Sequence, residues 1–521
     1  MLAGLPDALF LDREPFLAAL DQNAKASDLK LSAAVKKAIL NALSERDENA
    51  AICRDKKGAP EPDSSLRETD LGRYRPYSAY KASGVEWLGE IPSHWEVGRN
   101  RSMFIEVDER TETGDEELLT VSHITGVTRR SEKQVTMIKA ESHEGYKVCE
   151  PGDLVINTMW AWMGALGIAW ERGMVSPSYN VYRAIVGEFS GEYYDYFCRT
   201  QSTVCDIIRH SKGIWKSRLR LYPCEFMDIV SLHLPLPEQR AIAAFLDRET
   251  ARIDELVTHK KRLIELLQEK RSALITQAVT QGLDPSVEMK ESGVEWLGRV
   301  PAGWGVLKFR RVAETSYGVG GELDRTLTEG IPILSLPNVQ IDGTFNLDDI
   351  PFANVSENDK ESVLLRHGDL LFNWRNGSSK HLGKTTFFDL DGEFAHVSFL
   401  LKLRFDPDKN DSKYFQALIN GLRTTGFFAS SKAGVNNTFN QSELNELWVI
   451  VPPLEEQKQI AEHIKAESEQ LDLVIPAIEK AIDHLNEYRT ALISAAVTGK
   501  VDVRAPHPGP PQPGEGKIPA G

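Results

Sequence analysis

Two long stretches of the chain carry apolar residues at a regular spacing of seven, with mostly charged residues between them. The repeating positions of both stretches fall in one register. They are Leu246, Ile253, Leu267 and Leu274 in the first stretch, and Ile464, Leu471, Ile478, Leu485 and Leu492 in the second. Heptad spacing predicts two long helices, over 237–283 and 453–500, each with one narrow apolar stripe.

Because two matched stripes occur in one chain, we expect these helices to pair with each other. The alternative is that each helix packs on its own globular neighbour. Lys260 takes the place in the first series that Ile478 holds in the second. Pro476 predicts a kink or a restart in the second helix. The intervening seam is expected to be filled by Leu256, Leu263, Val474 and Ala481.

The segments outside these helices have a different pattern. They contain β-branched and aromatic runs such as LLTVSHI, DLVINTM and HVSFLLKL, separated by turn-prone residues, which is typical of mixed α/β domains. The stretch from Leu154 to Trp170 is apolar, but glycines and Asn157 interrupt it and acidic residues bracket it. We therefore expect buried strands there and not a membrane span.

An internal repeat organises the whole chain. SGVEWLG occurs at 83–89 and again at 292–298, and GDLVIN at 152–157 is echoed by GDLLFN at 368–373. RSALITQAVT, from Arg271, aligns with RTALISAAVT, from Arg489. The framework thus repeats while the globular interiors differ, which suggests one scaffold carrying two different recognition surfaces.

Composition limits what such surfaces can be. A chain of 521 residues, with 41% hydrophobic and 26% charged residues, predicts several ordinary globular domains. Its net charge of −15 means that any DNA-binding surface must be local, because Lys and Arg supply affinity for phosphates. The five cysteines form no CxxC pair and are odd in number, which argues against zinc knuckles and disulfides and favours the reducing cytoplasm.

Catalytic motifs are not found. An adenine methyltransferase needs an (N/D)PP(Y/F/W) loop, and none is present. Gly383, Lys384 and Thr385 end a phosphate-loop motif whose first glycine is misplaced. Asp284, Glu288 and Lys290 could be read as a nuclease group, but solvated charge in a connector is the better interpretation. We predict no catalytic residue, no metal and no cofactor in this chain.

Two groups of residues are candidates for DNA contact. No acid occurs from Ile207 to Arg220, and Asn and Arg can read adenine and guanine edges while Lys and Arg meet phosphates. The first group is Arg209, Lys212, Trp215, Lys216, Arg218 and Arg220; the second is Asn373, Arg375, Lys380, His381, Lys432, Asn436 and Asn437. The alternative for both groups is a solvated loop with ordinary turn residues.

The repeated strings also carry a family resemblance. SGVEWLGEIPSHWEV and SGVEWLGRVPAGWGV, the PLPEQ and LEEQ helix starts, the ALITQAVT and ALISAAVT ends, and GDLVINTMWAWMGALGIA followed by VSPSYNVY resemble Type I restriction enzyme specificity subunits, over about Tyr74 to Arg504. The resemblance implies two target recognition domains, each reading half of a split site in double-stranded DNA. It also implies docking of two modification subunits, which bind S-adenosylmethionine and methylate adenine at N6, and a restriction subunit that can join.

The implied fold is α+β, with two mixed α/β recognition domains separated by two long antiparallel coiled-coil helices in a pseudo-twofold repeat. The expected segments are an N-terminal extension (1–75), recognition domain 1 (76–236), helix 1 (237–283), connector and recognition domain 2 (284–452), helix 2 (453–500) and a disordered tail (501–521).

The extension departs from the family pattern. Its stretch from Ile39 to Asp70 resembles the C-terminal part of a modification subunit, and the alternative is a polar helical extension with a linker. Two other classes of protein stay open: a fused restriction–methylation enzyme with its own catalytic site, and a scaffold that bridges proteins without binding DNA.

Overall fold

The computed structural model describes residues 74–504, except 134–142, 186, 214–218, 321–326, 328, 341–343, 349, 376–380 and 431–437. The predictions for the N-terminal extension up to 73 and for the tail from 505 lie outside this range. The chain forms two units: the first contains residues up to Leu256 and from Asp483 onward, and the second contains Val257–Ile482.

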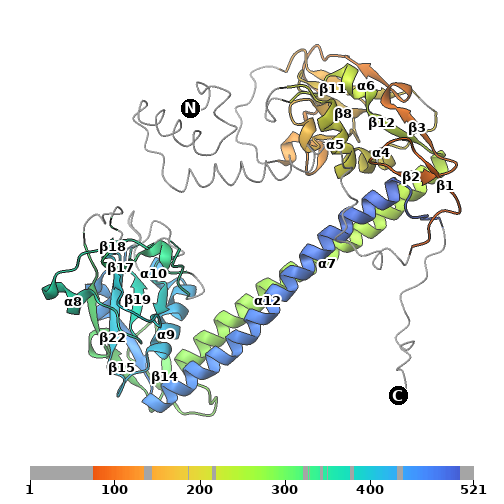
Figure 1. The fold of residues 1–521 in the computed structure, drawn as a ribbon. Coiled ribbons are helices and arrows are strands. Elements are labelled where there is room, and N and C mark those ends of the chain that lie inside the picture. The colour runs from red at the N-terminus through yellow and green to blue at the C-terminus, as the bar shows by residue number, and fades with distance from the viewer. Residues whose placement is uncertain are drawn as a thin grey trace. The chain divides into compact units, whose positions relative to one another are not determined.

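The first unit is built around an antiparallel sheet of four strands in the order β4-β11-β8-β9; Figure 1 labels its two central strands, β8 and β11. The sheet strands are β4 (Phe104–Val107), β11 (Tyr179–Ala184), β8 (Leu154–Asn157) and β9 (Leu166–Ile168). Smaller pairs are β1 (Tyr80–Ala82) with β2 (Glu90–Pro92), β3 (Glu96–Arg99) with β12 (Val230–His233), β5 (Leu119–Ser122) with β6 (Gly126–Arg129), and β7 (Lys147–Cys149) with β10 (Gly173–Val175). The short helices are α4 (Gly191–Cys198), α5 (Gln201–His210) and α6 (Pro223–Asp228), with 3-10 turns η2 (Asn100–Ser102), η3 (Arg130–Glu132) and η4 (Ala161–Met163).

The second unit repeats this sheet as β16-β22-β19-β20. Its strands are β16 (Ala313–Tyr317), β22 (Leu400–Phe405), β19 (Leu370–Asn373) and β20 (Thr385–Phe387). The smaller sheets pair β13 (Met289–Glu291) with β14 (Arg299–Pro301), β15 (Gly305–Lys308) with β23 (Trp448–Val451), and β17 (Ile331–Leu334) with β18 (Phe352–Ala353) and β21 (Ala395–His396). The short helices are α8 (Glu357–Val363), α9 (Ser412–Thr424), α10 (Phe427–Ser430) and α11 (Gln441–Glu446), with η6 (Phe309–Arg311) and η7 (Leu336–Asn338).

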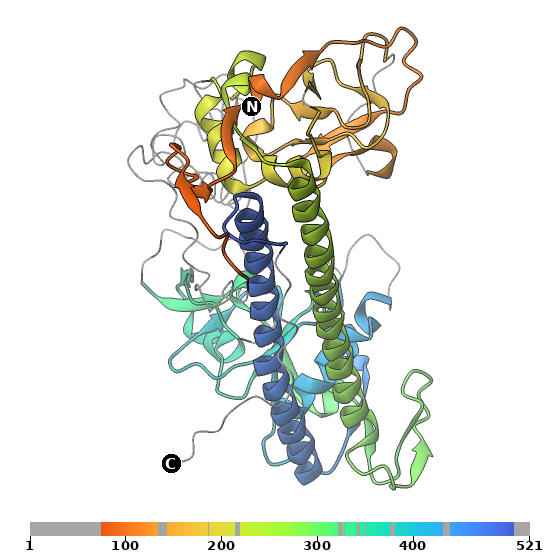
Figure 2. The same cartoon turned by 90° about the vertical axis from the view of Figure 1, so that its right-hand side faces the viewer.

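Two long helices, α7 (Leu236–Gln281) and α12 (Leu454–Val497), run side by side (Figure 1, Figure 2). Equivalent ion pairs join them in each unit: Arg489 Nε lies 3.0 Å from Asp254 Oδ1, and Arg271 pairs with Asp472 at the corresponding position. All nine predicted stripe positions are buried or half-buried, which confirms the antiparallel helix pair. The predicted restart at Pro476 is wrong, since α12 continues through it.

The predicted intervening seam is wrong at three of its four positions, since Ala481 alone among them is half-buried. Leu256, Leu263 and Val474 are each 44% exposed, whereas Thr250 and Val257 are buried at 4% and 8%. The residues four positions after each stripe residue are buried or half-buried. The stripe residues therefore hold the d positions of the heptad and not the a positions. Apolar residues enter the seam whether the stripe holds the a or the d positions. The sequence pattern alone therefore did not distinguish the two assignments.

The same contact, between a tryptophan and a glutamate, occurs at the start of each long helix, because both halves of the repeat carry these residues in matching strings. The Trp95 indole donates to Glu238 Oε1 at 3.1 Å in the first unit, and Trp304 donates to Glu456 Oε2 at 2.9 Å in the second. Both tryptophans are buried. Each α/β domain is therefore fastened to the start of one long helix through the EWLG…W and EQ strings of its own half.

Each domain also contacts the end of the other long helix, within its own unit. The Tyr193 hydroxyl donates to Val497 O at 2.9 Å, and the Tyr414 hydroxyl lies 3.3 Å from Val279 O. Both tyrosines are buried. These contacts explain why the first unit takes in residues from both ends of the sequence, whereas the second is one continuous segment.

The predicted buried strands between Leu154 and Trp170 are confirmed, since β8 and β9 lie in the central sheet with fully buried patterns. Across the described ranges, none of the helices is long and apolar enough to cross a membrane. The two α/β domains, the antiparallel long helices and the internal repeat together confirm the predicted α+β fold.

Candidate nucleic-acid interface

The basic run of the first unit forms a bridged loop after α5. Arg209 lies in the last turn of α5, with a guanidinium nitrogen 4.0 Å from Asp206 Oδ1. The Lys212 and Arg220 backbones exchange two hydrogen bonds, of 2.9 and 2.8 Å, which hold the two sides of the loop together. Trp215, Lys216 and Arg218 lie outside the described residues.

An acidic side chain reaches this run from another element. The Lys212 ammonium forms an ion pair with Glu225 of α6. A hydrogen bond from Cys224 and the contact with Lys212 lower the pKa of the Glu225 carboxyl to about 2. The sequence showed no acid within the run, because Glu225 lies beyond it and reaches Lys212 only in the folded chain. Lys212 is still 68% exposed, so the pair with Glu225 leaves its ammonium accessible to solvent.

The basic run lies beside the loop that follows β8. Leu221 N–H donates to Thr158 O at 3.4 Å, and a side chain at Gly164 would approach Val204 of α5. We call the loop 158–163 together with 209–213 and 219–221 the first tip. Trp160 is 49% exposed there, and sequence reasoning did not single it out because it stood within an apolar run.

The second unit has a corresponding tip, residues 374–375 and 438–439 with Phe399. Phe439 N–H donates to Trp374 O at 2.7 Å, as Leu221 donates to Thr158 in the first unit. The Arg375 guanidinium carbon lies 5.7 Å from the centre of the Phe399 ring, which is 44% exposed. The tip thus combines a cation and an aromatic ring at the same end of the repeated sheet.

Asn373 does not fit the expected role of a DNA contact in this conformation. Its side chain is fully buried, and its backbone pairs with Lys384 O and Gly383 N–H, both at 2.8 Å. Asn373 is the last residue of β19, and both faces of this strand are covered. Its amide is therefore buried although the tip begins at the next residue. His381 is half-buried, and its carbonyl accepts from Lys384 N–H at 3.2 Å. Lys380, Lys432, Asn436 and Asn437 lie outside the described residues.

Lys384, the lysine of the incomplete phosphate-loop motif, is buried. Its ammonium donates to Val339 O inside the second unit. A lysine engaged in this way cannot reach a nucleotide phosphate without losing that contact. The location agrees with the sequence argument against a phosphate loop.

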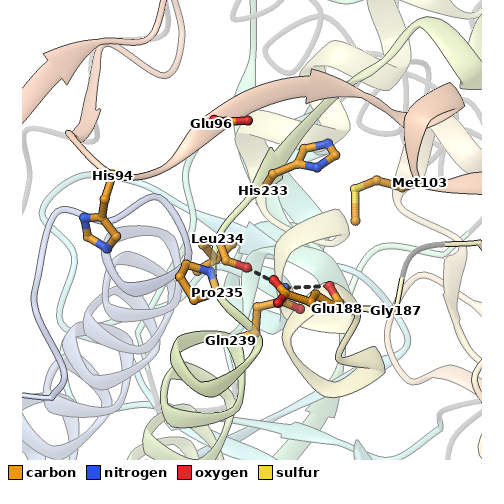
Figure 3. A pocket seen from close by; sticks show the side chains of 9 residues that line it. All are labelled: His94, Glu96, Met103, Gly187, Glu188, His233, Leu234, Pro235 and Gln239. Carbon is orange, nitrogen blue, oxygen red and sulfur yellow. Dashed lines mark hydrogen bonds between the residues drawn. The ribbon is translucent and has the colours of Figure 1, made fainter.

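An open pocket of about 440 Å³ lies at the start of α7 and is lined by His94, Glu96, Met103, Gly187, Glu188, His233, Leu234, Pro235 and Gln239 (Figure 3). The Gln239 amide donates to Leu234 O at 2.9 Å and Glu188 O at 3.1 Å and accepts from Ser190 N–H at 2.8 Å. Its polar atoms thus fasten the domain to the helix, as Gln457 does in the second unit. Within the described ranges, no three His, Cys, Asp or Glu side chains are grouped to hold a metal.

Comparison with known proteins gives one consistent family. Residues 345–482 match the family model described as the Type I restriction modification DNA specificity domain. The chain is 27% identical over 214 residues to the type I restriction enzyme EcoKI specificity subunit of Escherichia coli, covering 39% of this chain and 44% of that protein. It is 22% identical over 284 residues to the StySPI specificity subunit of Salmonella potsdam, covering 54% of this chain and 59% of that protein. The matches therefore span about half the length of these curated relatives.

Solved structures share the fold. A chain from a structure described as showing complex assembly and conformational transition of the type I R-M system has a TM-score of 0.61 at 16% identity, covering 79% of this chain and 99% of that chain. The HsdS subunit from Thermoanaerobacter tengcongensis has a TM-score of 0.50 at 16% identity, covering 79% of this chain and 98% of its own. The resemblance predicted from the repeated strings is confirmed by these matches.

Proposed function

We propose that this chain is the subunit that selects the DNA sequence for a Type I restriction-modification complex. The proposal follows from its similarity to the specificity subunits of such complexes. In this proposal each unit reads one half of a bipartite site. The observation that carries it is the repeat: two sheets of the same strand order end in corresponding tips whose side chains differ. The same framework with different tips is what two different half-sites require.

The partners are proposed to be two modification subunits that bind S-adenosylmethionine and methylate adenine at N6, with restriction subunits joining them. A docking surface is available on the outer faces of α7 and α12, where large apolar residues are exposed. These are Leu256, Leu263, Leu266, Leu473 and Val474, with Leu473 77% exposed. Several exposed apolar residues on paired helices favour a protein partner.

The chain itself is proposed to be non-catalytic and to act in the cytoplasm. The four described cysteines are free thiols, which suits a reducing compartment. The fused-enzyme alternative requires a catalytic group that the sequence does not supply. The scaffold alternative leaves the cations and exposed aromatics of the tips without a role.

The test uses the full chain purified alone and with modification subunits. We expect methyl transfer and specific DNA binding by the complex, and methylation sequencing should reveal two short half-sites separated by an unspecified spacer. Methyl transfer by the chain alone would support the fused enzyme. A complex that assembles but shows no preference for any DNA sequence would support the scaffold.

A further inference from the structure

The first tip presents a tryptophan whose exposure is not explained by the fold. The Trp160 side chain is 49% exposed, while the neighbouring Trp162 is half-buried. The two rings are stacked, with centroids 6.5 Å apart and planes inclined by 14°. The Trp162 indole donates to Met159 O at 3.0 Å, so the inner ring is anchored and supports the outer one.

The backbone around Trp160 is fixed before any ligand arrives. Its N–H donates to Asn157 O at 3.0 Å, and its carbonyl accepts from Met163 N–H at 2.9 Å and Ala165 N–H at 3.2 Å. Gly164 closes this turn with a φ of +85°, a conformation that favours glycine. A loop whose backbone is held in this way loses little backbone entropy when it binds a ligand.

The surroundings of Trp160 favour a polyanion with flat apolar parts. The loop that carries Trp160 touches the basic run through Leu221 and Thr158. Arg209, Lys212 and Arg220 lie in that run, with Asp206 and Glu225 as the acids that contact them. The second tip repeats the combination, with Arg375 over the exposed ring of Phe399. Nucleic acid offers phosphates and stacked bases together, which neither an acidic protein surface nor a free phosphate does.

We propose that Trp160 is a DNA contact of the first half-site that stacks on a base at an opened base step, beside the phosphate contacts of the basic run. This inference rests on the proposed function. Aromatic stacking on a base is independent of counterion release, whereas each phosphate contact adds about one unit to the salt dependence of binding. The two kinds of contact therefore predict different responses to salt.

The experiment measures binding of the full chain, assembled with modification subunits, to a duplex carrying the methylated motif and to one with a scrambled motif. Trp160→Ala should weaken specific binding by about tenfold while leaving the salt slope unchanged, and Trp160→Phe should restore most of the affinity. Lys212→Ala should instead lower the slope by about one unit.

Trp170→Ala is the matched control. Trp170 is 55% exposed but follows β9 at the opposite end of the sheet, where Gly152 N–H donates to Ala169 O at 2.8 Å. Its removal should leave DNA affinity unchanged, and equal loss in both variants would overturn the proposal. Wild-type affinity in Trp160→Ala, or a reduced salt slope in that variant, would also overturn it. If the wild-type complex itself shows no sequence preference, the proposed function fails, and this outcome is separate from any effect of Trp160.

Discussion

The aspartate of each GDL string is buried against an arginine from the neighbouring strand. Asp153 accepts from Arg183 at 2.9 and 2.8 Å, and Asp369 accepts from Arg404 at 2.8 and 2.6 Å. Each carboxylate also accepts a backbone N–H from three residues earlier, at 2.9 and 2.8 Å. The echo in the sequence is thus a structural clamp between β8 and β11 and between β19 and β22, and it does not contact the tips.

Removing this clamp should destabilise the unit. Asp369→Ala leaves the Arg404 guanidinium partly buried without its partner, so we expect a loss of about 3 kcal/mol in the free energy of unfolding. Asp406→Ala breaks an exposed pair with Lys409, which solvent screens, and should cost much less. Chemical denaturation of the two variants checks the difference. Equal stability would mean that the buried pair contributes no more than a surface pair.

His396 provides a pH-dependent prediction at the residue scale. Burial lowers the pKa of its imidazole to about 4, while the nearby Lys402 acts in the same direction. The unfolded chain binds a proton near pH 6.5 and the folded chain does not, so stability falls as the pH drops from about 6.5 towards 4. Between pH 7.5 and 4.5 the loss due to His396 should be about 2 kcal/mol. Hydrogen exchange at β22 should show this loss of stability in the wild type and a smaller loss in His396→Gln. Equal losses in the two proteins would mean that His396 does not cause the pH dependence.

At the scale of elements, the long helices show what the sequence could and could not predict. Their existence, bounds to within a few residues, and main stripe followed from the heptads. The heptads did not predict which residues lie between the stripe residues in the seam, because Leu256 and Val257 are both apolar and adjacent. Packing against the partner helix decides which one is buried, and that information is not local.

The corrected phase predicts effects of very different size for the same substitution at two adjacent positions. Val257→Asp places a charge in the buried seam and should destabilise the helix pair by about 3 kcal/mol. Leu256→Asp changes an exposed residue and should cost less than about 1 kcal/mol, yet it should weaken binding of modification subunits if the outer face docks them. Thermal unfolding measures the stability of both variants, and pull-down of the modification subunit measures their binding. The reverse order of stability would restore the original seam.

At the scale of the whole molecule, the repeat permits an exchange of recognition domains. Replacing about residues 100–232 by the corresponding segment of another specificity subunit keeps Trp95, Glu238 and α7, which fasten the domain to the helices. We expect one half of the methylation motif to change and the other to remain. Methylation sequencing reads both halves, and a change in both halves by a folded, assembled chimera would contradict independent half-sites.

The candidate site was less predictable than the framework. Repeated strings identified the contacts that join helices and domains, since those contacts are the same in both units. The side chains of the tips differ between units, so the repeat indicated where each tip lies but not which of its side chains are exposed. Asn373 was selected because Asn can read an adenine edge, but its side chain is buried; Trp160 stood in a stretch expected to form buried strands, but its side chain is exposed.

The first unit combines two segments that are far apart in the sequence, and this affects the order in which the units fold during synthesis. Its contacts include Asp502 N–H donating to Arg75 O at 2.8 Å and the Lys500 ammonium donating to Leu88 O at 3.0 Å. On the ribosome, the early segment therefore emerges long before the residues that complete it, whereas Val257–Ile482 emerges as one continuous piece. The second unit can finish folding first, against the usual N-terminal-first order of synthesis. Until the last turn of α12 leaves the ribosome, the nascent first unit lacks part of its packing surface, and this is the interval in which chaperones would have most to bind.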